Sequence, residues 1–279
     1  MSIREMVIVA LVGLLAGTHA AIWGMYKDAI HEGFTNATFA RSMIVGLVCA
    51  IAIQLYLDLP IQNPGTLVLL FGLTYAAERG VVEVWKTFIR DEDQSKYFIP
   101  MQFTLYGRPV RSRLARLGLG VVYVAVVSLV LFVIAQFDGG APPTRFRMAM
   151  VGLATGMIVA ISGAWKDAPK EGFEILKFFR SPAMTVSYAL LLSFFTDSYL
   201  LAAAGALGFE RATAETYKTF FFPSKPRGKF AGKPVLYPEM LTRRYYFVPV
   251  YVSIWLAVIA CATTALVSPT STLFAASGY

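Results

Sequence analysis

Eight apolar segments, separated by charged clusters, dominate the pattern of hydrophobic and polar positions along this 279-residue chain. Each is close to the roughly 20 residues that an α-helix needs to cross about 30 Å of hydrocarbon. The pattern therefore predicts about eight transmembrane helices. They cover approximately residues 6–25, 42–59, 66–88, 116–137, 146–164, 182–197, 198–221 and 246–268.

A gapless internal repeat divides the chain into two halves. Residues 10–42 and 149–181 share 17 of 33 positions at a constant offset of 139 (149 − 10 = 139). Such self-similarity indicates a duplicated architecture. Because each half has an even number of helices, the repeats are parallel and related by an axis along the membrane normal. We predict an all-α integral membrane bundle with pseudo-two-fold symmetry, in which 1–139 and 140–279 are two four-helix repeats of one membrane domain.

Composition and charge agree with this fold class. The chain is 57% hydrophobic and 15% charged, and its mean hydropathy is +0.59. Of its 25 basic residues, 22 lie in or beside four connections on one side, and the exceptions are Arg4, Arg145 and Arg147. Basic loops face the cytoplasm. We therefore expect a bacterial inner (plasma) membrane protein with both termini outside, and the net charge of +8 gives no reason to expect nucleic-acid binding.

Residues that hold metals or carry out nucleophilic catalysis are scarce. His19 and His31 do not recur between the halves, and Cys49 and Cys261 lie in apolar segments. The chain has neither a phosphate-binding P-loop nor a dinucleotide-binding fingerprint, and it lacks a nucleophile elbow. We expect no metal site and no cofactor.

The segment after the first and fifth apolar runs repeats a set of ionisable residues. Asp28 and Asp167 are predicted to cap a short cytoplasmic helix, and Ser42 and Ser181 to cap the next membrane helix. The repeated ionisable residues are Lys27 and Lys166, Asp28 and Asp167, Glu32 and Glu171, and Arg41 and Arg180. They form either an ion-pair cluster beneath the membrane or a ligand site.

The third and seventh apolar segments carry matching charged stripes. Glu78, Arg79 and Glu83 in the first half correspond to Glu210, Arg211 and Glu215 in the second. Glu78 follows Gly65 by 13 residues (78 − 65 = 13), or about 20 Å of helix. The first Glu–Arg pair of each stripe is thus expected in the inner half of the bilayer, where a charged side chain usually has a functional partner.

Helical spacing predicts the partners within these stripes. Arg79, Glu83 and Lys86 share one face, so Arg79 should pair with Glu83, and Glu83 with Lys86. Glu78 points about 100° away. We expect Arg41 to be its partner, and Arg180 to be the partner of Glu210.

Two further patterns concern packing and the membrane surface. Gly13-x-x-x-Gly17 and Gly152-x-x-x-Gly156 are typical of close helix contacts, and we expect the first helix to pack on the fifth. The basic, proline-containing segments 97–116 and 223–244 are expected to lie on anionic headgroups.

Three functions remain compatible with the sequence. The favoured one is a transporter or channel for a small ion or polar solute, with Glu78 and Glu210 binding the solute or a proton and arginines as counter-charges. The second is an enzyme acting on phospholipid or isoprenoid-phosphate headgroups, using Mg²⁺ on the repeated aspartates and glutamates. The third is a structural subunit of a membrane complex. The sequence leaves open whether the chain forms a homo-oligomer.

Overall fold

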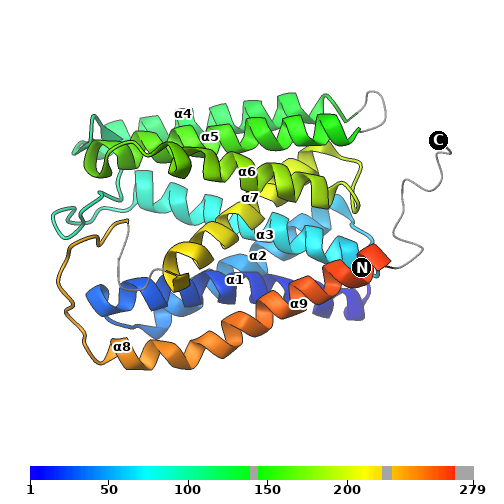
Figure 1. The fold of residues 1–279 in the computed structure, drawn as a ribbon, viewed down its shortest axis with the longest axis horizontal. Helices are drawn as coiled ribbons and strands as arrows, with labels where there is room; N and C mark the ends of the chain where they lie inside the picture. The colour runs from blue at the N-terminus through cyan, green and yellow to red at the C-terminus, as the bar shows by residue number, and fades with distance from the viewer. Residues whose placement is uncertain (139–143, 222–227, 268–279) are drawn as a thin grey trace.

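In the computed structural model of the chain, which describes residues 1–138, 144–221 and 228–267, the fold is all-helical apart from one short hairpin. The long helices run alternately between the two ends of the molecule (Figure 1). Their bounds are α1 Ile3–Glu32, α2 Asn36–Leu57, α3 Pro64–Val84, α4 Arg113–Ala135, α5 Arg145–Glu171, α6 Ile175–Leu192, α7 Tyr199–Thr216 and α9 Val248–Val267. Short elements are β1 Thr104–Leu105, β2 Arg108–Pro109, α8 Met240–Arg243 and η3 Arg244–Phe247.

Five helical stretches are long and apolar enough to cross a membrane. They are α1, α2, α4, α5 and the continuous stretch Met240–Val267. The start of α1 and the end of α9 lie at one end of the molecule, and the hairpin and α8 lie at the other, which we call the basic end (Figure 1). An integral membrane protein is therefore consistent with the described structure.

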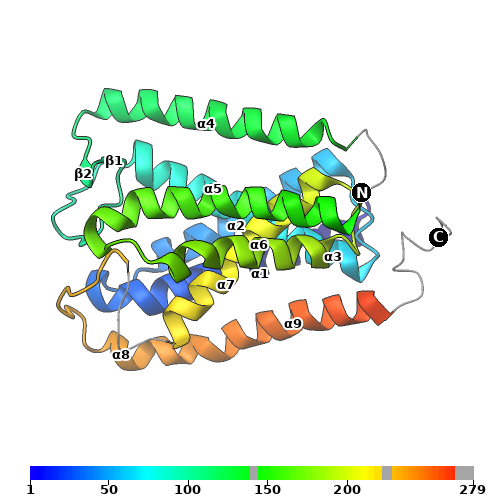
Figure 2. The ribbon, with the colours of Figure 1, turned by 45° about the horizontal axis from the view of Figure 1, so that its top comes forward.

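Helix α4 stands apart from the other helices. In Figure 2 it runs along the edge of the bundle, and only 6% of its most apolar 18-residue window is buried. Large side chains such as Val121, Leu129 and Phe132 are exposed along it. Exposed apolar residues on this scale are expected where a helix faces lipid.

The glycines of α1 and α5 pack inside their own halves, so the predicted contact between the first and fifth helices is wrong. A Cβ on Gly13 would lie 2.8 Å from the Cβ of Ala50 on α2, and one on Gly152 would lie 2.9 Å from the Cβ of Ala189 on α6. The two contacts are 139 residues apart at both partners, because 152 − 13 = 139 and 189 − 50 = 139.

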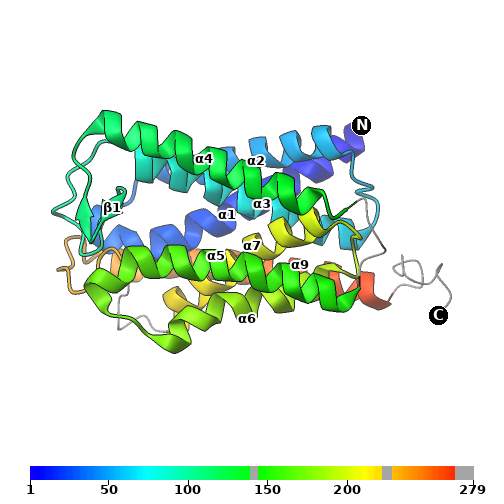
Figure 3. The same ribbon diagram turned by 90° about the horizontal axis from the view of Figure 1, so that it is seen from above.

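The centre of the bundle is instead a glycine seam between α3 and α7, which cross in the middle of the molecule (Figure 3). A Cβ on Gly208 would lie 1.9 Å from the carbonyl oxygen of Gly72, and one on Gly72 would lie 2.8 Å from that of Gly205. The buried apolar residues around it include Leu69 and Phe209. The seam is close-packed protein.

The predicted short cytoplasmic helices are absent from the described residues, and the helix caps expected there are wrong. Asp28 and Asp167 lie inside α1 and α5, each of which continues for another turn to a glycine with positive φ. Buried Ala29 and Ile30 favour this continuation of α1. The next helices start earlier than predicted, at Asn36 and Ile175.

Candidate functional site

A series of buried and half-buried charges, called the charge chain below, lies between the α3–α7 seam and the basic end of the bundle. At its inner end Glu78 is fully buried and forms an ion pair with Arg79, the next residue in the chain. Arg79 also lies over the ring of Trp23, 5.4 Å from its centroid, and its Nη2 lies 3.5 Å from Ser42 Oγ. The predicted pairing of Glu78 with Arg41 is therefore wrong.

Glu210 has a different environment from Glu78. It is 3% exposed, and its Oε1 accepts a hydrogen bond of 2.6 Å from the hydroxyl of Ser181. Neither Arg180 nor any other basic side chain in the described residues forms an ion pair with it. Ser42 and Ser181, predicted as helix caps, are instead buried inside α2 and α6 and contact the charged stripes.

The charge chain continues across the two halves. Arg211 Nη2 lies 3.2 Å from a Glu215 oxygen and 3.9 Å from Glu83 on α3. Lys27 on α1 and Lys218 each lie 3.6 Å from the Glu215 carboxylate, which is only 2% exposed. Three cations thus share one buried carboxylate. The predicted Arg79–Glu83 and Glu83–Lys86 pairs do not form close ion pairs in the described residues, whereas the same spacing in the second half gives the Arg211–Glu215 and Glu215–Lys218 pairs.

Both charged stripes end in a π-helical turn. These turns are η1 Trp85–Ile89 and η2 Tyr217–Phe221, and they lie 132 residues apart at both ends (217 − 85 = 132; 221 − 89 = 132). A π-turn is wider than an α-turn and is often found at functional sites. Lys218 in η2 still lies 3.6 Å from Glu215, as the i,i+3 spacing predicts, whereas Lys86 in η1 forms no ion pair with Glu83 among the described residues.

The acidic residues at the end of α1 are paired with the loops. Lys229 Nζ lies 3.0 Å from Asp28 and 3.3 Å from Glu32, and the Tyr97 hydroxyl donates to Glu32 at 3.0 Å. Burial alone would lower the pKa of Lys229, but the two carboxylates outweigh it and raise that pKa above its usual value. These residues form a clasp that joins two distant loops to α1.

In the second half Lys177 has the role that Lys229 has in the first, because it pairs with both carboxylates at the end of α5. Its Nζ lies 3.3 Å from Asp167 and 2.5 Å from Glu171, and the backbone N–H of Gly228 donates to Glu171 at 3.3 Å. Lys166, the counterpart of Lys27, is half-buried and has no ion pair among the described residues.

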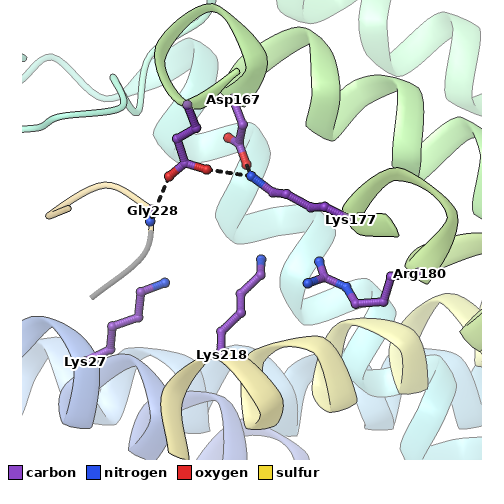
Figure 4. A pocket seen from close by; sticks show the side chains of 7 residues that line it. Lys27, Asp167, Lys177, Arg180, Lys218 and Gly228 are labelled. Atoms are coloured by element: carbon purple, nitrogen blue, oxygen red, sulfur yellow. Dashed lines mark hydrogen bonds and ion pairs between the residues drawn. The ribbon is translucent and has the colours of Figure 1, made fainter. Parts of the chain in front are cut away.

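A pocket opens at the basic end, beside these ion pairs. Its lining residues are Lys27, Asp167, Glu171, Lys177, Arg180, Lys218 and Gly228, and its empty space, including the part open to solvent, is about 300 Å³. In Figure 4 Lys27, Lys218 and Arg180 point into the pocket from one side, while Asp167 and Lys177 lie on the other. The Nε of Arg180 is buried without a hydrogen-bond partner, and no described carboxylate forms an ion pair with Arg180.

Sequence reasoning selected most of these residues and missed several partners. Lys177, Lys218 and Lys229 were not among its candidates, although Lys218 matches Lys86 in the stripe of the other half. That match is a signal that could have identified Lys218. Lys177 and Lys229 have no such signal, because they are not counterparts in the repeat.

Two other expectations can be compared with the structure. In the described ranges no three histidine, cysteine, aspartate or glutamate side chains are grouped closely enough to hold a metal ion. Part of the basic segment 223–244 lies outside the described residues, which omit 222–227.

Comparison of the chain with protein-family models, curated proteins and solved structures finds no match.

Proposed function

We propose that this chain is a membrane transporter for a small anion, and that the pocket at the basic end is its cytoplasmic binding site. In this proposal all eight long helices cross the membrane as two four-helix repeats, with both termini outside. The matched packing of Gly13 and Gly152 supports the duplication, as do the matched π-turns.

The observation that carries the proposal is the set of cations in the pocket. Lys27 comes from the first half, and Arg180 and Lys218 come from the second. Lys27 and Lys218 share Glu215 with Arg211, and Arg180 has no carboxylate partner in the described structure. Positive groups that lack their own counter-charge attract anions and raise their local concentration.

Transport through the two buried carboxylates, favoured by the sequence, receives less support. It requires Glu78 and Glu210 to face a shared solvated cavity, but Glu78 is paired with Arg79 and fully buried in the protein. The solute is therefore proposed to be an anion, with the carboxylates as internal counter-charges. Ionisable groups that line a membrane pathway commonly pair in this way.

The close-packed seam at Gly72 and Gly208 is proposed to be the closed gate of this pathway. The charge chain from Lys218 through Glu215 and Arg211 to Glu83 links the pocket to α3 and α7. Movement of the two halves about an axis between them is the usual mode of parallel-repeat transporters.

The enzyme hypothesis is less well supported, because it needs carboxylates that are free to bind Mg²⁺. Asp28 and Glu32 are held by Lys229, and Asp167 and Glu171 by Lys177. The chain would need to break these ion pairs to form the metal site.

Proteoliposomes test the transport proposal. Purified protein is reconstituted, and the influx of chloride, sulfate and inorganic phosphate is measured for the wild type, Arg180→Gln and Arg41→Gln. Arg41 is the repeat counterpart of Arg180 and lies outside the pocket, so it is the matched control. We expect saturable influx of at least one anion, reduced about tenfold or more by Arg180→Gln only, since losing a charge-assisted contact costs about 1.5–3 kcal/mol. Equal flux in protein-free liposomes would refute the proposal.

A further inference from the structure

We infer that the pocket at the basic end binds a phosphoryl group, either inorganic phosphate or a phosphate monoester. The inference rests on the proposed function, because it names the chemical class of the anion. Three features of the pocket carry it, namely its net charge, the donor geometry and the acidic wall opposite the cations.

The charge of the lining matches a dianion. Four basic side chains and two carboxylates line the pocket, which leaves a formal charge of +2 (4 − 2 = 2). Phosphate esters carry about −1.5 to −2 charges near neutral pH. A monovalent anion such as chloride would leave part of this charge uncompensated.

The donors approach from three different elements. Lys27 belongs to α1, Arg180 to α6 and Lys218 to the π-turn η2, and all three point into the same space (Figure 4). A tetrahedral oxyanion presents oxygens in several directions and can accept from all three. Arginine adds a planar fork that binds phosphate through two parallel hydrogen bonds.

The opposite wall distinguishes phosphate from sulfate. Asp167 directs one oxygen, Oδ2, to Lys177 at 3.3 Å, and Oδ1 has no ion pair among the described residues. A carboxylate oxygen accepts hydrogen bonds only. It can therefore accept from the P–OH of hydrogen phosphate or of a monoester in its monoanionic form, whereas sulfate is fully ionised at neutral pH and brings only repulsion.

The phosphoryl group has two potential sources, a solute in the cytoplasm or the headgroup of a lipid. Basic pockets between helices at a membrane surface bind phosphate-bearing headgroups. Both sources use the same cations, so binding in detergent is compared with binding in lipid.

The experiment is isothermal titration of inorganic phosphate into the full chain in phospholipid-free detergent, with sodium sulfate at matched ionic strength as comparison. We expect saturable phosphate binding, weakened about tenfold or more by Arg180→Gln and by Lys218→Gln, and unchanged by Arg41→Gln and Lys86→Gln. Arg180→Lys, which keeps the charge and loses the fork, should fall between wild type and Arg180→Gln. Sulfate should bind about tenfold more weakly than phosphate in the wild type, and Asp167→Asn should reduce that difference.

A second arm repeats the titration in nanodiscs of phosphatidylcholine alone or with phosphatidic acid. Loss of phosphate binding only with phosphatidic acid assigns the pocket to a lipid headgroup, and retained binding assigns it to a soluble phosphate. Absence of saturable phosphate binding to monodisperse wild type overturns the inference, as does equal weakening by the counterpart variants.

Failure of this inference differs from failure of the proposed function. Phosphate binding without flux in proteoliposomes removes transport and leaves the site. Flux of chloride without phosphate binding leaves transport and removes the phosphoryl assignment.

Discussion

Gly208→Ala tests the α3–α7 seam at its closest point. The added Cβ would lie 1.9 Å from the carbonyl oxygen of Gly72 and 3.0 Å from the amide nitrogen of Ala76. Ordinary van der Waals contact begins at about 3.4 Å. The helices must therefore separate locally by about 1.5 Å (3.4 − 1.9 = 1.5), because both obstructing atoms belong to the backbone and cannot rotate away.

The separation should be costly because the seam is tight on both sides of Gly208. Overpacking of a well-packed interior typically costs about 1–3 kcal/mol. We expect the upper end of that range here, about 3 kcal/mol, since no side chain can yield. At roughly 2 °C or more per kcal/mol for a chain of this size, the midpoint of thermal unfolding should fall by about 6 °C.

The assay is thermal unfolding in detergent, followed by tryptophan fluorescence. Gly80→Ala is the matched control, because Gly80 lies on α3 and a Cβ there would meet nothing within 4 Å. Replacing an exposed helical glycine by alanine favours the helix, so the control should melt at or above the wild-type temperature. A Gly208→Ala protein that melts within a degree of wild type would mean that the two helices do not cross at these glycines.

Three other outcomes follow from the charges. Glu215→Gln should destabilise the protein by about 3 kcal/mol, since removing one partner of a buried ion pair leaves uncompensated charge. The same change should tighten phosphate binding, because it frees Lys27 and Lys218. Denaturation measures the loss of stability and titration measures the gain in affinity, and unchanged stability contradicts the shared pairing. Ser181→Ala should lower the free energy of unfolding by about 2 kcal/mol, because the hydrogen bond to Glu210 is lost. The control Ser187→Ala loses only a hydrogen bond to its own helix and should change the stability little. Equal melting temperatures of the two variants would contradict the hydrogen bond between Ser181 and Glu210. Lys229→Met should increase proteolysis of the 228–240 segment at pH 7. Because the folded pKa of Lys229 is raised above its usual 10.5, the clasp is fully present below pH 10.5 and is lost as the pH rises through the higher folded pKa. Wild type and variant should then be cleaved at the same rate, and a difference that persists in strong alkali contradicts this assignment.

Much of the fold could be predicted from the sequence because hydrophobic periodicity and length carry that information. The long helices coincide with the apolar segments, although α1 begins at Ile3 and continues to Glu32, beyond the predicted 6–25. The predicted helix ends were wrong where a residue typical of a helix cap has another role in the structure. Asp28 resembles a helix cap, but it lies in the last turns of α1 because its partner is Lys229 on a distant loop.

The site was predictable in its residue types and not in its pairings. Spacing on one helix gives only local neighbours, and here the local rule failed for Glu83, whose partner is Arg211 on another helix. The same rule holds in the second half, where Glu215 pairs with Arg211 and Lys218. In the first half a contact outside the rule decides the result, because the seam brings α3 and α7 close enough for Arg211 to reach Glu83.

Pocket and seam are connected through Glu215, and in the proposed function this connection links anion binding to the opening of the proposed gate. The Glu215 carboxylate holds Lys27 and Lys218 on the pocket side and Arg211 on the seam side. An anion that draws the two lysines away leaves Glu215 to Arg211 alone. Arg211 then pairs more strongly with Glu215 and less with Glu83, which it already contacts only at 3.9 Å. Under the proposed function, we therefore expect the ion pair that joins α7 to α3 to weaken when the pocket fills.

Coupling between the pocket and the seam is measurable as the difference between the phosphate-induced stabilisation of the wild type and that of a seam variant. If anion binding acts on the seam through Glu83 and Arg211, phosphate should stabilise Glu83→Gln more than it stabilises wild type, because the variant has no cross-helix ion pair to lose. Since Arg41→Gln removes a charge on α2 that forms no ion pair with Glu83, Arg211 or Glu215 in the described residues, it should respond to phosphate as wild type does. Identical phosphate-induced shifts in all three proteins would separate the pocket from the seam and require another route for opening.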